Sequence, residues 1–416
     1  MGSILYRKGV FMDFLNSVVG TINDFLWTYI IIVVLVGCGL WFTFSTGLVQ
    51  LRALPEMVRL LAGDLGRRPS GRKAISSFQA FCVSTASRVG VGNIAGVAIA
   101  IVTGGPGAVF WMWVIAFIGT ATGFVESTLA QIYKIPRGHG LFHGGPAYYI
   151  QNALGQPTVA KLFAVLISVT FGLIYVSVQA NTIALSMEKA FGIETWVMGV
   201  VLAVLAGAVI FGGIHRVASL SAFLVPIMAG IYLLIALIII ILHMDAVPAM
   251  FALILHDAFS PQAAVGGGIG TAVLTGIRRG LFSNEAGEGS IPNAAATANV
   301  THPVKQGLVQ AFGVYVDTWI VCSATAFIVL LTGQYTIGGD TTGIALAQDS
   351  LASVFGPWAS SLLAVLIFLF AFSSVVGNYY YGEINIHFIT KNTQRALSVY
   401  RLAVVAMVFF GCVAAF

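Results

Sequence analysis

The sequence predicts an all-α, polytopic membrane protein built as an inverted repeat of five plus five helices. Hydrophobic residues make up 58% of the 416 residues, charged residues only 8%, and the mean hydropathy is +0.94. Soluble domains carry about 25% charged residues, so this composition excludes an ordinary soluble protein. Apolar runs of about 20 residues, long enough to cross a bilayer, recur along the chain, and two of them are interrupted by polar and glycine-rich stretches.

The N-terminal part of the chain predicts an interfacial segment followed by one span. Residues 1–24 mix charged and aromatic side chains, as short interfacial helices do. The first apolar run, 25–47, is too long for the core of a cleaved signal and has no small-residue cleavage pattern after it. We expect it to be an extra transmembrane helix that stands before the repeat.

Ten spans are expected in total. Their predicted limits are 25–47, 78–103, 107–131, 159–187, 196–213, 217–243, 264–300 with an interruption, 306–332, 358–389 and 396–416. The segment from Gly343 to Phe355 is too short and polar to span, and it is expected to form a surface or loop helix.

Lysine and arginine gather in alternate loops, which predicts orientation. Basic residues follow the first, third, fifth, seventh and ninth spans, whereas the opposite loops are acidic, with Lys189 their only basic residue. Because cytoplasmic loops carry the excess of Lys and Arg, the N-terminus is expected outside and the basic loops in the cytoplasm. The positions of the charges, rather than the net charge of +5, therefore decide the interpretation, and no nucleic-acid partner is expected.

The two interrupted spans are the second and the seventh. An offset of five helices means that they run in opposite directions, which is the signature of an inverted repeat with substrate held between the breaks. The first repeat would cover 78–243 and the second 264–416. The second repeat should end with an eleventh helix, so the last helix is expected to be missing from this chain.

The stretch that contains the first break, Ser76 to Thr103, reads SSFQAFCVSTASRVGVGNIAGVAIAIVT. Glycines cost a helix about 1 kcal/mol each relative to Ala, and polar groups are expensive in hydrocarbon, so Arg88 to Asn93 is expected to unwind where it lines a cavity. Ala86 to Asn93 would offer carbonyls to a cation and amides to a carboxylate. Half-helix ends carry partial charges, so this arrangement would suit a zwitterion such as an amino acid. A glycine-rich packing helix is the alternative.

The second break is expected at Phe282 to Gly289, where Phe282, Ser283 and Asn284 are candidates for contact with substrate. Core packing is the alternative for Phe282. Glu285 and Glu288 lie near Arg278 and Arg279 in the sequence. Since charges inside a bilayer should pair or face water, we expect these four residues mainly to form ion pairs and gate contacts.

Further polar groups interrupt the fourth and ninth spans. Ser373 and Ser374 on the ninth span could form an oxygen cage for a hard cation such as sodium, opposite the carbonyls of the first break. Asn378 follows one helical turn beyond Ser374 and could line the neighbouring pocket. Gln179 on the fourth span is a candidate pocket residue, with a bond between helices as the alternative.

Enzymatic motifs are absent from the sequence, so an enzyme is not expected. We find no zinc-binding His-Glu-x-x-His, nucleophile elbow or nucleotide-binding loop, and Cys38, Cys82, Cys322 and Cys412 match no metal spacing and are expected to be small buried hydrophobes. A channel would require a repeated selectivity filter or a ring of charged residues from symmetric subunits. Two unlike breaks favour an alternating-access carrier.

Several long motifs resemble one family. They are SRVGVGNIAGVA from Ser87, GGPGAVFWMW from Gly104, HGGPAYYI from His143, GLFSNEAGEGSIPNAA from Gly280, HPVKQG from His302 and FAFSSVVGNYYYGE from Phe370. From about residue 25 onward the chain is similar to the sodium:alanine symporters of the alanine or glycine:cation symporter family. The resemblance implies a LeuT-type fold and sodium-coupled uptake of small neutral amino acids, chiefly alanine and glycine, across the plasma membrane.

The resemblance also implies site residues, with sodium as the coupling ion and no obligate protein partner. Sodium would lie among Ala86, Val89, Phe370, Ser373 and Ser374. Substrate would lie beside Gly90, Gly92 and Asn93, under Phe282 and near Gln179. Many members have Trp where Asn378 stands, a departure that would widen the pocket.

A proton-coupled permease of the same fold is the alternative function. Glu126, Asp317 and Glu383 lie within or near spans, and buried carboxylates can carry protons. In that reading Glu126, Glu285 or Glu288 would be the proton carrier.

Overall fold

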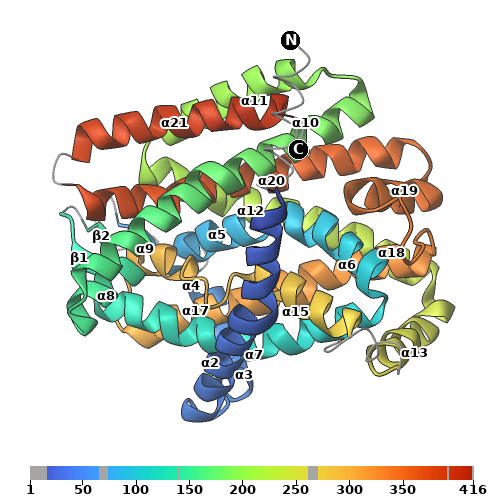
Figure 1. The fold of residues 1–416 in the computed structure, drawn as a ribbon, viewed down its shortest axis with the longest axis horizontal. Coiled ribbons are helices and arrows are strands. Elements are labelled where there is room, and N and C mark those ends of the chain that lie inside the picture. The colour runs from blue at the N-terminus through green and yellow to red at the C-terminus, as the bar shows by residue number, and fades with distance from the viewer. Residues whose placement is uncertain (1–15, 65–73, 139, 261–269, 391–392, 415–416) are drawn as a thin grey trace.

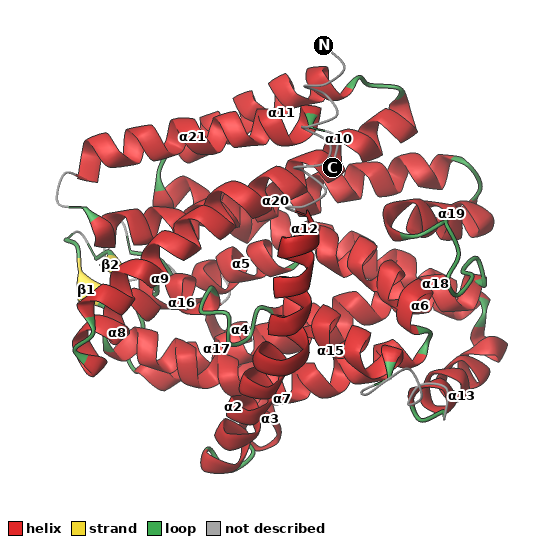
Figure 2. Ribbon diagram, in the orientation of Figure 1, coloured by secondary structure: helices red, strands yellow, loops and turns green. Residues whose placement is uncertain are grey.

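The structure is a computed structural model that describes residues 16–64, 74–138, 140–260, 270–390 and 393–414. Almost all of these residues are helical, and long helices lie side by side in a bundle (Figures 1 and 2). The one sheet in the described part of the chain is a hairpin in which β1 (Ile135–Pro136) pairs antiparallel with β2 (Phe142–His143). The prediction of an all-α membrane protein with several spans is confirmed.

The helices of the first half are α2 (Ile32–Ser45), α3 (Val49–Arg52), α4 (Leu54–Asp64), α5 (Ser77–Arg88), α6 (Val97–Gly104), α7 (Gly107–Ile132), α8 (Pro146–Leu154), α9 (Pro157–Val169), α10 (Val176–Phe191), α11 (Thr195–Ile210) and α12 (Ile214–Leu242). Those of the second half are α13 (Val247–Ala258), α15 (Thr271–Asn284), α16 (Ile291–Thr297), α17 (Pro303–Val314), α18 (Ser323–Thr332), α19 (Gly343–Phe355), α20 (Trp358–Ile389) and α21 (Thr393–Val413). Wider π-helical turns join several of them, at Leu26–Ile31, Gly92–Gly96, Thr170–Tyr175 and Tyr315–Cys322.

Among the residues that the structure describes, seven helices are long and apolar enough to cross a membrane, and the bent pair α5 and α6 makes eight. Two further predicted spans have helices that fall short of this measure: α11 has 16 residues, and the seventh predicted span is divided between α15 and α16. Residues 264–269 of that span lie outside the described residues. The predicted short helix Gly343–Phe355 is confirmed with those bounds as α19.

The first break lies where it was expected. A capping box between Ser76 and Gln79 starts α5, and the helix ends at Arg88. Val89 then has ψ of 83°, which turns its carbonyl out of the helical ladder. The chain resumes as a π-helical turn at Gly92, and its axis has bent by 53°.

The second break lies later than predicted. α15 continues to Asn284, so Phe282, Ser283 and Asn284 occupy the last helical turn instead of the break itself. Glu285 (φ 54°), Gly287 (φ 89°) and Gly289 (φ 77°) then adopt left-handed conformations that glycine tolerates readily, and α16 begins at Ile291.

The N-terminal helix differs from the prediction for residues 1–24. Residues 16–24 continue directly into the first apolar run as one helix, Asn16–Ser45, while residues 1–15 lie outside the described part. In Figure 1 α2 crosses the long helices of the bundle steeply. Only 11% of the residues in the apolar part of this helix are buried within the protein. Cys38, which lies on it, is exposed, so the expectation that all four cysteines are buried is wrong for this one.

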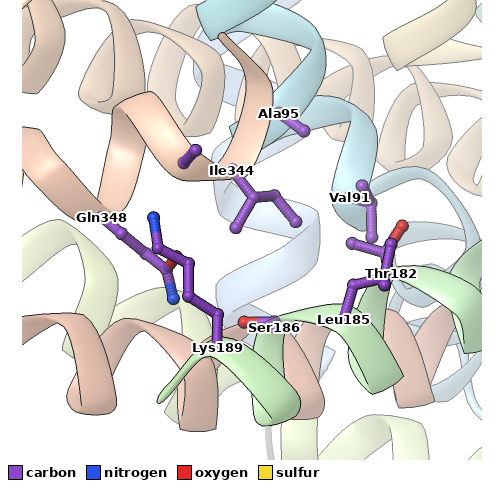
Figure 3. Close-up of a pocket in the computed structure, with 9 residues that line it drawn as sticks. Val91, Ala95, Thr182, Leu185, Ser186, Lys189, Ile344 and Gln348 are labelled. Carbon is purple, nitrogen blue, oxygen red and sulfur yellow. The ribbon is translucent and has the colours of Figure 1, made fainter. Parts of the chain in front are cut away.

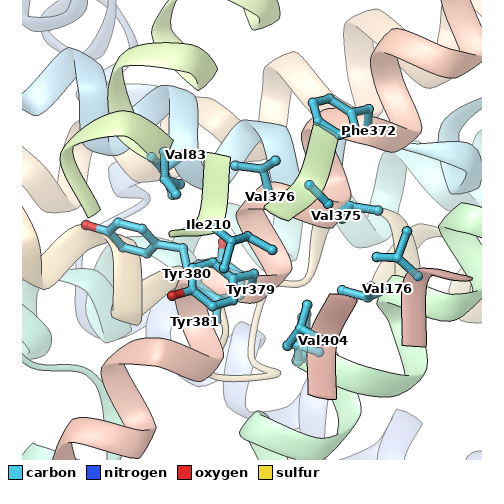
Figure 4. Packing of buried hydrophobic residues seen from close by; sticks show 14 of the residues in the cluster. Val83, Val176, Ile210, Phe372, Val375, Val376, Tyr379, Tyr380, Tyr381 and Val404 are labelled. Atoms are coloured by element: carbon cyan, nitrogen blue, oxygen red, sulfur yellow. The ribbon is translucent and has the colours of Figure 1, made fainter. Parts of the chain in front are cut away.

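The helix α20 is among the most deeply buried of the long helices, with Ser373 to Asn385 all inside the protein. Tyr379, Tyr380 and Tyr381 are fully buried in its second half (Figure 4). Val83 of α5 and Val404 of α21 belong to the same cluster, so α20 is held between the first break and the last helix. This packing fixes the position of Ser373 and Ser374, two turns earlier on α20.

Replacing Gly289 with Ala should destabilise the fold. A Cβ atom there would lie 2.8 Å from Phe163 Cζ at a φ of 77°, so strain and overpacking should cost about 1–3 kcal/mol. Gly230→Ala on α12 is the control, because its Cβ would meet nothing within 4 Å. Thermal unfolding of the purified protein in detergent measures both; equal melting temperatures would contradict the geometry of the second break.

Candidate functional site

The candidate site lies where the first break meets α20, α10 and the end of α15. Ser374 Oγ donates hydrogen bonds to the Ala86 carbonyl (2.8 Å) and to the Phe370 carbonyl (3.1 Å), and Ser373 Oγ donates to the Phe370 carbonyl (2.8 Å). All four residues are at most 1% exposed. The structure thus brings four of the five predicted sodium ligands into one buried cluster of oxygen atoms.

This cluster has the chemistry that a hard cation requires. It consists of two hydroxyl and two carbonyl oxygens, and oxygen ligands suit sodium as they suit other hard cations. Val89, the fifth predicted ligand, is 1% exposed and turns its carbonyl out of the helix. The Thr85 hydroxyl, one residue before Ala86, is buried and has no hydrogen-bond partner among the described residues. The donor set therefore fits a sodium ion in place of the bonds that the serine hydroxyls now make.

The predicted substrate residues Gly90, Gly92, Gln179 and Phe282 surround the same break. A Cβ on Gly90 would lie 2.4 Å from Ser374 Oγ and 3.1 Å from Gln179 Oε1, so the glycine lies between the oxygen cluster and α10. Gln179 Oε1 accepts a hydrogen bond from the Val91 amide (3.2 Å). Phe282 is 38% exposed, and its ring is 3.4 Å from the position of a Cβ on Gly92.

Asn93 is buried within the first break and connects its backbone to neighbouring helices. Its Oδ1 accepts a hydrogen bond from the Gly90 amide (3.0 Å), and its Nδ2 donates to Asp317 Oδ1 (2.7 Å) and to Ser283 Oγ (3.1 Å). The Ser283 hydroxyl donates to Asp317 Oδ2 (2.7 Å). Asn93 and Ser283 are therefore brought together as predicted, through a carboxylate on the π-helical turn Tyr315–Cys322.

Asn284 and Asn378 lie apart from this group. Asn284 Oδ1 accepts from the Ala286 amide (3.0 Å) and lies near Gly119 of α7. Asn378 is 1% exposed and its Oδ1 accepts a hydrogen bond from Ser87 Oγ (2.6 Å). The position of Asn378 therefore places its amide in the contact between α20 and α5.

The expected ion pairs at the second break are wrong. Arg278 pairs with Asp24 (3.8 Å), and Glu285 accepts hydrogen bonds from Ser87 Oγ (3.0 Å) and Ser290 Oγ (2.5 Å). Within the described ranges, no ion pair joins Glu285 or Glu288 to Arg278 or Arg279. The spacing in the sequence misled because these side chains find partners elsewhere. Arg278 also donates to Thr28 Oγ1 (3.1 Å) of the N-terminal helix, and Arg279 lies near Gly96, beyond the first break.

The cation that faces the buried acids is Arg88. It is 3% exposed, and its guanidinium donates to the Ser84 carbonyl (3.2 Å) and to Ser84 Oγ (2.9 Å). Its positive charge acts on Glu126, Glu285 and Asp317. Within the described residues Arg88 forms no ion pair with a carboxylate, so these acids are not neutralised by direct contact, and buried charges without compensation are costly.

Sequence reasoning missed the roles of Asp317 and Arg88. Asp317 was noted only as a buried carboxylate, and it proves to be the group on which Asn93 and Ser283 converge. An ionisable residue inside an apolar span is a functional candidate by default, which was the available signal. Glu383, noted in the same way, forms an ion pair with Arg401 (3.0 Å) at the far end of α20.

Replacing Gly90 with Ala should abolish the effect of sodium on stability. The new Cβ would displace Ser374 Oγ from the oxygen cluster, whereas a ligand that binds only the folded state raises the melting temperature. The measurement is the melting temperature with sodium chloride against choline chloride. Gly207→Ala on α11 is the control, since its nearest neighbour would be 3.8 Å away. A sodium-dependent rise that survives in Gly90→Ala would exclude this cluster as the ion site.

Comparison with known proteins agrees with the motifs. The profile of the sodium:alanine symporter family matches residues 12–416. The amino-acid carrier protein AlsT of Bacillus subtilis is 52% identical over 97% of this chain and 85% of its own length. The probable sodium/glutamine symporter GlnT of the same bacterium is 51% identical (96% and 83%), and the sodium/alanine symporter AgcS of Methanococcus maripaludis is 37% identical (97% and 89%). This chain therefore belongs to the sodium:alanine symporter family.

Proposed function

We propose that the protein is a secondary active transporter that couples the inward movement of sodium to the uptake of small neutral amino acids, chiefly alanine and glycine. The observation that carries this proposal is the buried oxygen cluster of Ala86, Phe370, Ser373 and Ser374, directly beside Gly90. Membership of the sodium:alanine symporter family supports it, as does the name of the Methanococcus relative. The protein is not an enzyme in this proposal.

Sodium would act as a tie between the first break and α20. The ion's ligands come from both, so the ion would hold the two elements in one arrangement and favour the outward-open state. A ligand that binds two conformations with equal affinity does not change the balance between them. Coupling therefore requires that the oxygen cluster be complete in only one of the outward-open and inward-open states. One charge moving inward supplies about 2.3 kcal/mol per 100 mV of membrane potential.

The amino acid would bind at Gly90, Gly92 and Asn93, between the break and Phe282. The amides at the start of the second half-helix favour the carboxylate, because a helix N-terminus carries a partial positive charge of about half a unit. Phe282, which lies close to Gly92, would limit the size of the side chain that the bound amino acid can have. Asn93 would act mainly by holding the break in shape, because Asp317 and Ser283 already engage its amide.

The fold would be of the LeuT type, with ten spans, an extra first helix, a first repeat over 78–243 and a second over 264–416. Two interrupted helices, α5 with α6 and α15 with α16, meet at Asn93 and Ser283, which supports this arrangement. We place the protein in the plasma membrane with its N-terminus outside, because the basic loops alternate along the chain. Substrate would then be exposed to each side in turn as the repeats rock.

A proton-coupled permease is the second candidate. Glu126, Glu285 and Asp317 are buried, and within the described residues no ion pair joins any of them to a cation. Buried charges without a partner are costly, so these groups could hold protons inside the membrane. One relative, 44% identical, is named a putative sodium/proton-dependent alanine carrier protein. The exchange of protons at these groups would drive uptake without the oxygen cluster.

Uptake of radiolabelled alanine into proteoliposomes distinguishes the two. An inward sodium gradient should drive accumulation, and a proton gradient in sodium-free buffer should not. Glycine should compete with alanine, while glutamine tests whether the range extends to a larger side chain. Accumulation driven by protons alone would reject sodium coupling, and no uptake under either gradient would reject the transporter itself.

Removing both hydroxyls, Ser373→Ala with Ser374→Ala, should raise the sodium concentration for half-maximal uptake by about tenfold or more, because each lost ligand costs roughly 1 kcal/mol. The alanine requirement at saturating sodium should change less. Ser398→Ala on α21 is the control, since this serine is exposed and its hydroxyl donates to the Gln394 carbonyl of the same helix. Equal shifts in the two requirements would contradict the assignment of these serines to sodium.

Replacing Glu285 with Gln should leave sodium as the driving ion. Gln keeps one acceptor oxygen, so one of the two hydroxyls of Ser87 and Ser290 must turn to accept from the new NH2 group. The change removes the titrating group at nearly the same shape, so sodium-driven uptake should retain its dependence on sodium concentration. The check is the pH profile of uptake in wild type and variant. If the variant loses uptake under a proton gradient that the wild type can use, Glu285 is the proton carrier and the second candidate is correct.

A further inference from the structure

A cavity of about 580 Å³ lies outside the candidate site, at the end of the bundle where β1 and β2 are found (Figure 1). At about 30 Å³ for each water molecule in the liquid, it has room for roughly twenty waters, or for a hydrated anion. It differs from the cavity between α10, α19 and the first break, where the cation Lys189 is already paired with Asp349 at 3.7 Å (Figure 3). Here two arginines and one carboxylate line the walls, so positive charge is in excess.

Segments that are far apart in the sequence form this cavity. They are the hairpin after α7, the junction of α11 and α12, the end of α20 and the start of α21. Arg137, Gly212 and Gln394 in its lining are exposed, so a solute can reach it from the surface. The loops after the third, fifth and ninth spans, which meet here, are cytoplasmic in the proposed orientation.

One of the two arginines, Arg401, forms an ion pair in the wall. Its Nη2 lies 3.0 Å from Glu383 Oε1, and its Nε donates to the Tyr379 hydroxyl (2.8 Å). The side chain of Arg401 is 19% exposed and that of Glu383 is 4% exposed, so the pair is largely removed from solvent. Within the described residues Nη1 of Arg401 donates no hydrogen bond, so this guanidinium keeps donors for a ligand.

The other arginine, Arg137, forms no ion pair with a carboxylate in the part of the chain that the structure describes. Its Nε donates to His143 Nδ1 (3.2 Å), and its Nη2 donates to His387 Nδ1. A ring nitrogen that accepts a hydrogen bond carries no proton, so both rings are neutral. Burial lowers the pKa of His143 well below its ordinary value, and His387 and Arg137 lower it further, which agrees with a neutral ring.

The two histidines therefore position Arg137 without compensating its charge. Their rings meet edge to face with centroids 4.5 Å apart, and His143 is only 3% exposed. A long arginine side chain at a surface normally samples many rotamers, and a guanidinium held in place binds a ligand at a smaller cost in entropy. His387 also lies between the two arginines, because its Nε2 is 4.0 Å from the Glu383 carboxylate that pairs with Arg401.

The start of α12 adds backbone amides to the same wall. Gly212, Gly213 and Ile214 line the cavity, and Gly213 (φ 74°) is the N-cap, which has no side chain to accept from the first turn. A helix N-terminus carries a partial positive charge of about half a unit. Guanidinium groups and helix N-termini are the groups that most often bind phosphate in proteins.

We propose that this cavity binds a phosphate group at the cytoplasmic face of the protein, with Arg137 and Arg401 as its ligands and the start of α12 beside them. The phosphate belongs to a soluble compound or to the headgroup of an anionic lipid, which present the same chemistry to the site. The inference goes beyond the proposed function and takes from it only the orientation. Because the binding groups come from the hairpin, α12 and α21, the bound phosphate ties these three segments together.

Thermal unfolding of the full-length protein in detergent tests the site with inorganic phosphate. Potassium phosphate is compared with potassium chloride at equal ionic strength and pH, so that sodium does not enter the measurement. Phosphate should raise the melting temperature, because a ligand that binds only the folded state stabilises it. Equilibrium dialysis with radiolabelled phosphate then gives the dissociation constant directly.

Arg137→Gln should raise the dissociation constant for phosphate about tenfold or more, since it removes a charged donor. Arg401→Gln combined with Glu383→Gln should have a similar effect, and it removes both members of the ion pair so that no charge is left buried alone. Arg395→Gln is the matched control. Arg395 is an exposed arginine of α21 that lines a separate cavity, so this variant should bind phosphate as the wild type does.

Short-chain phosphatidic acid, added in the same detergent, distinguishes the two sources of the phosphate. Binding of inorganic phosphate that is weakened by Arg137→Gln supports the site with a soluble ligand. Stabilisation by the lipid alone, lost in Arg137→Gln, supports it with a lipid headgroup. Binding of neither probe, equal binding in wild type and Arg137→Gln, or an equal effect of chloride would overturn the proposal. These readouts do not involve transport, so they are independent of the proposed function.

Discussion

The interruption of helical hydrogen bonding at Val89 to Val91 is the constraint on which the rest of the structure depends. Backbone groups freed at this depth cannot be satisfied by lipid, so other elements must provide partners. Ser374 bonds the Ala86 carbonyl, Gln179 accepts from the Val91 amide and Asn93 accepts from the Gly90 amide. The first bond joins the break to α20, the second joins it to α10, and the third lies within the break itself. Together they create the polar surroundings in which an ion and a zwitterion can bind.

The buried charge around the break follows from the same constraint. Arg88 ends α5 where the helical carbonyls lack partners, and a cation is favoured at a helix C-terminus. Its charge acts on Glu126, Glu285 and Asp317, which come from three other segments. Sodium entering the nearby oxygen cluster would add positive charge to this environment, so binding of the ion and protonation of the acids should compete.

The helical elements, the first break and the serines on α20 could be predicted because each leaves a local mark in the sequence. Glycines and polar groups within an apolar run indicate a break in the helix. Two adjacent hydroxyls, Ser373 and Ser374, are conspicuous on an otherwise apolar helix. The partners of these groups could not be predicted. Asn93 and Asp317 are 224 residues apart, and the pairing expected for Glu285 failed because proximity in the sequence says little about which face a broken helix presents.

The position of the first break explains how the ion and the amino acid could influence one another. The Val91 amide is held by Gln179, and Gly90, next to it in the chain, lies against Ser374 Oγ. If the ion ties the break to α20, the backbone beside which the amino acid would bind is set by the same event. Binding of the amino acid would in turn favour the arrangement of the break that completes the ligands of the ion, because coupling between two sites acts equally in both directions. The helix break is thus the element through which binding of the ion and binding of the substrate would affect one another.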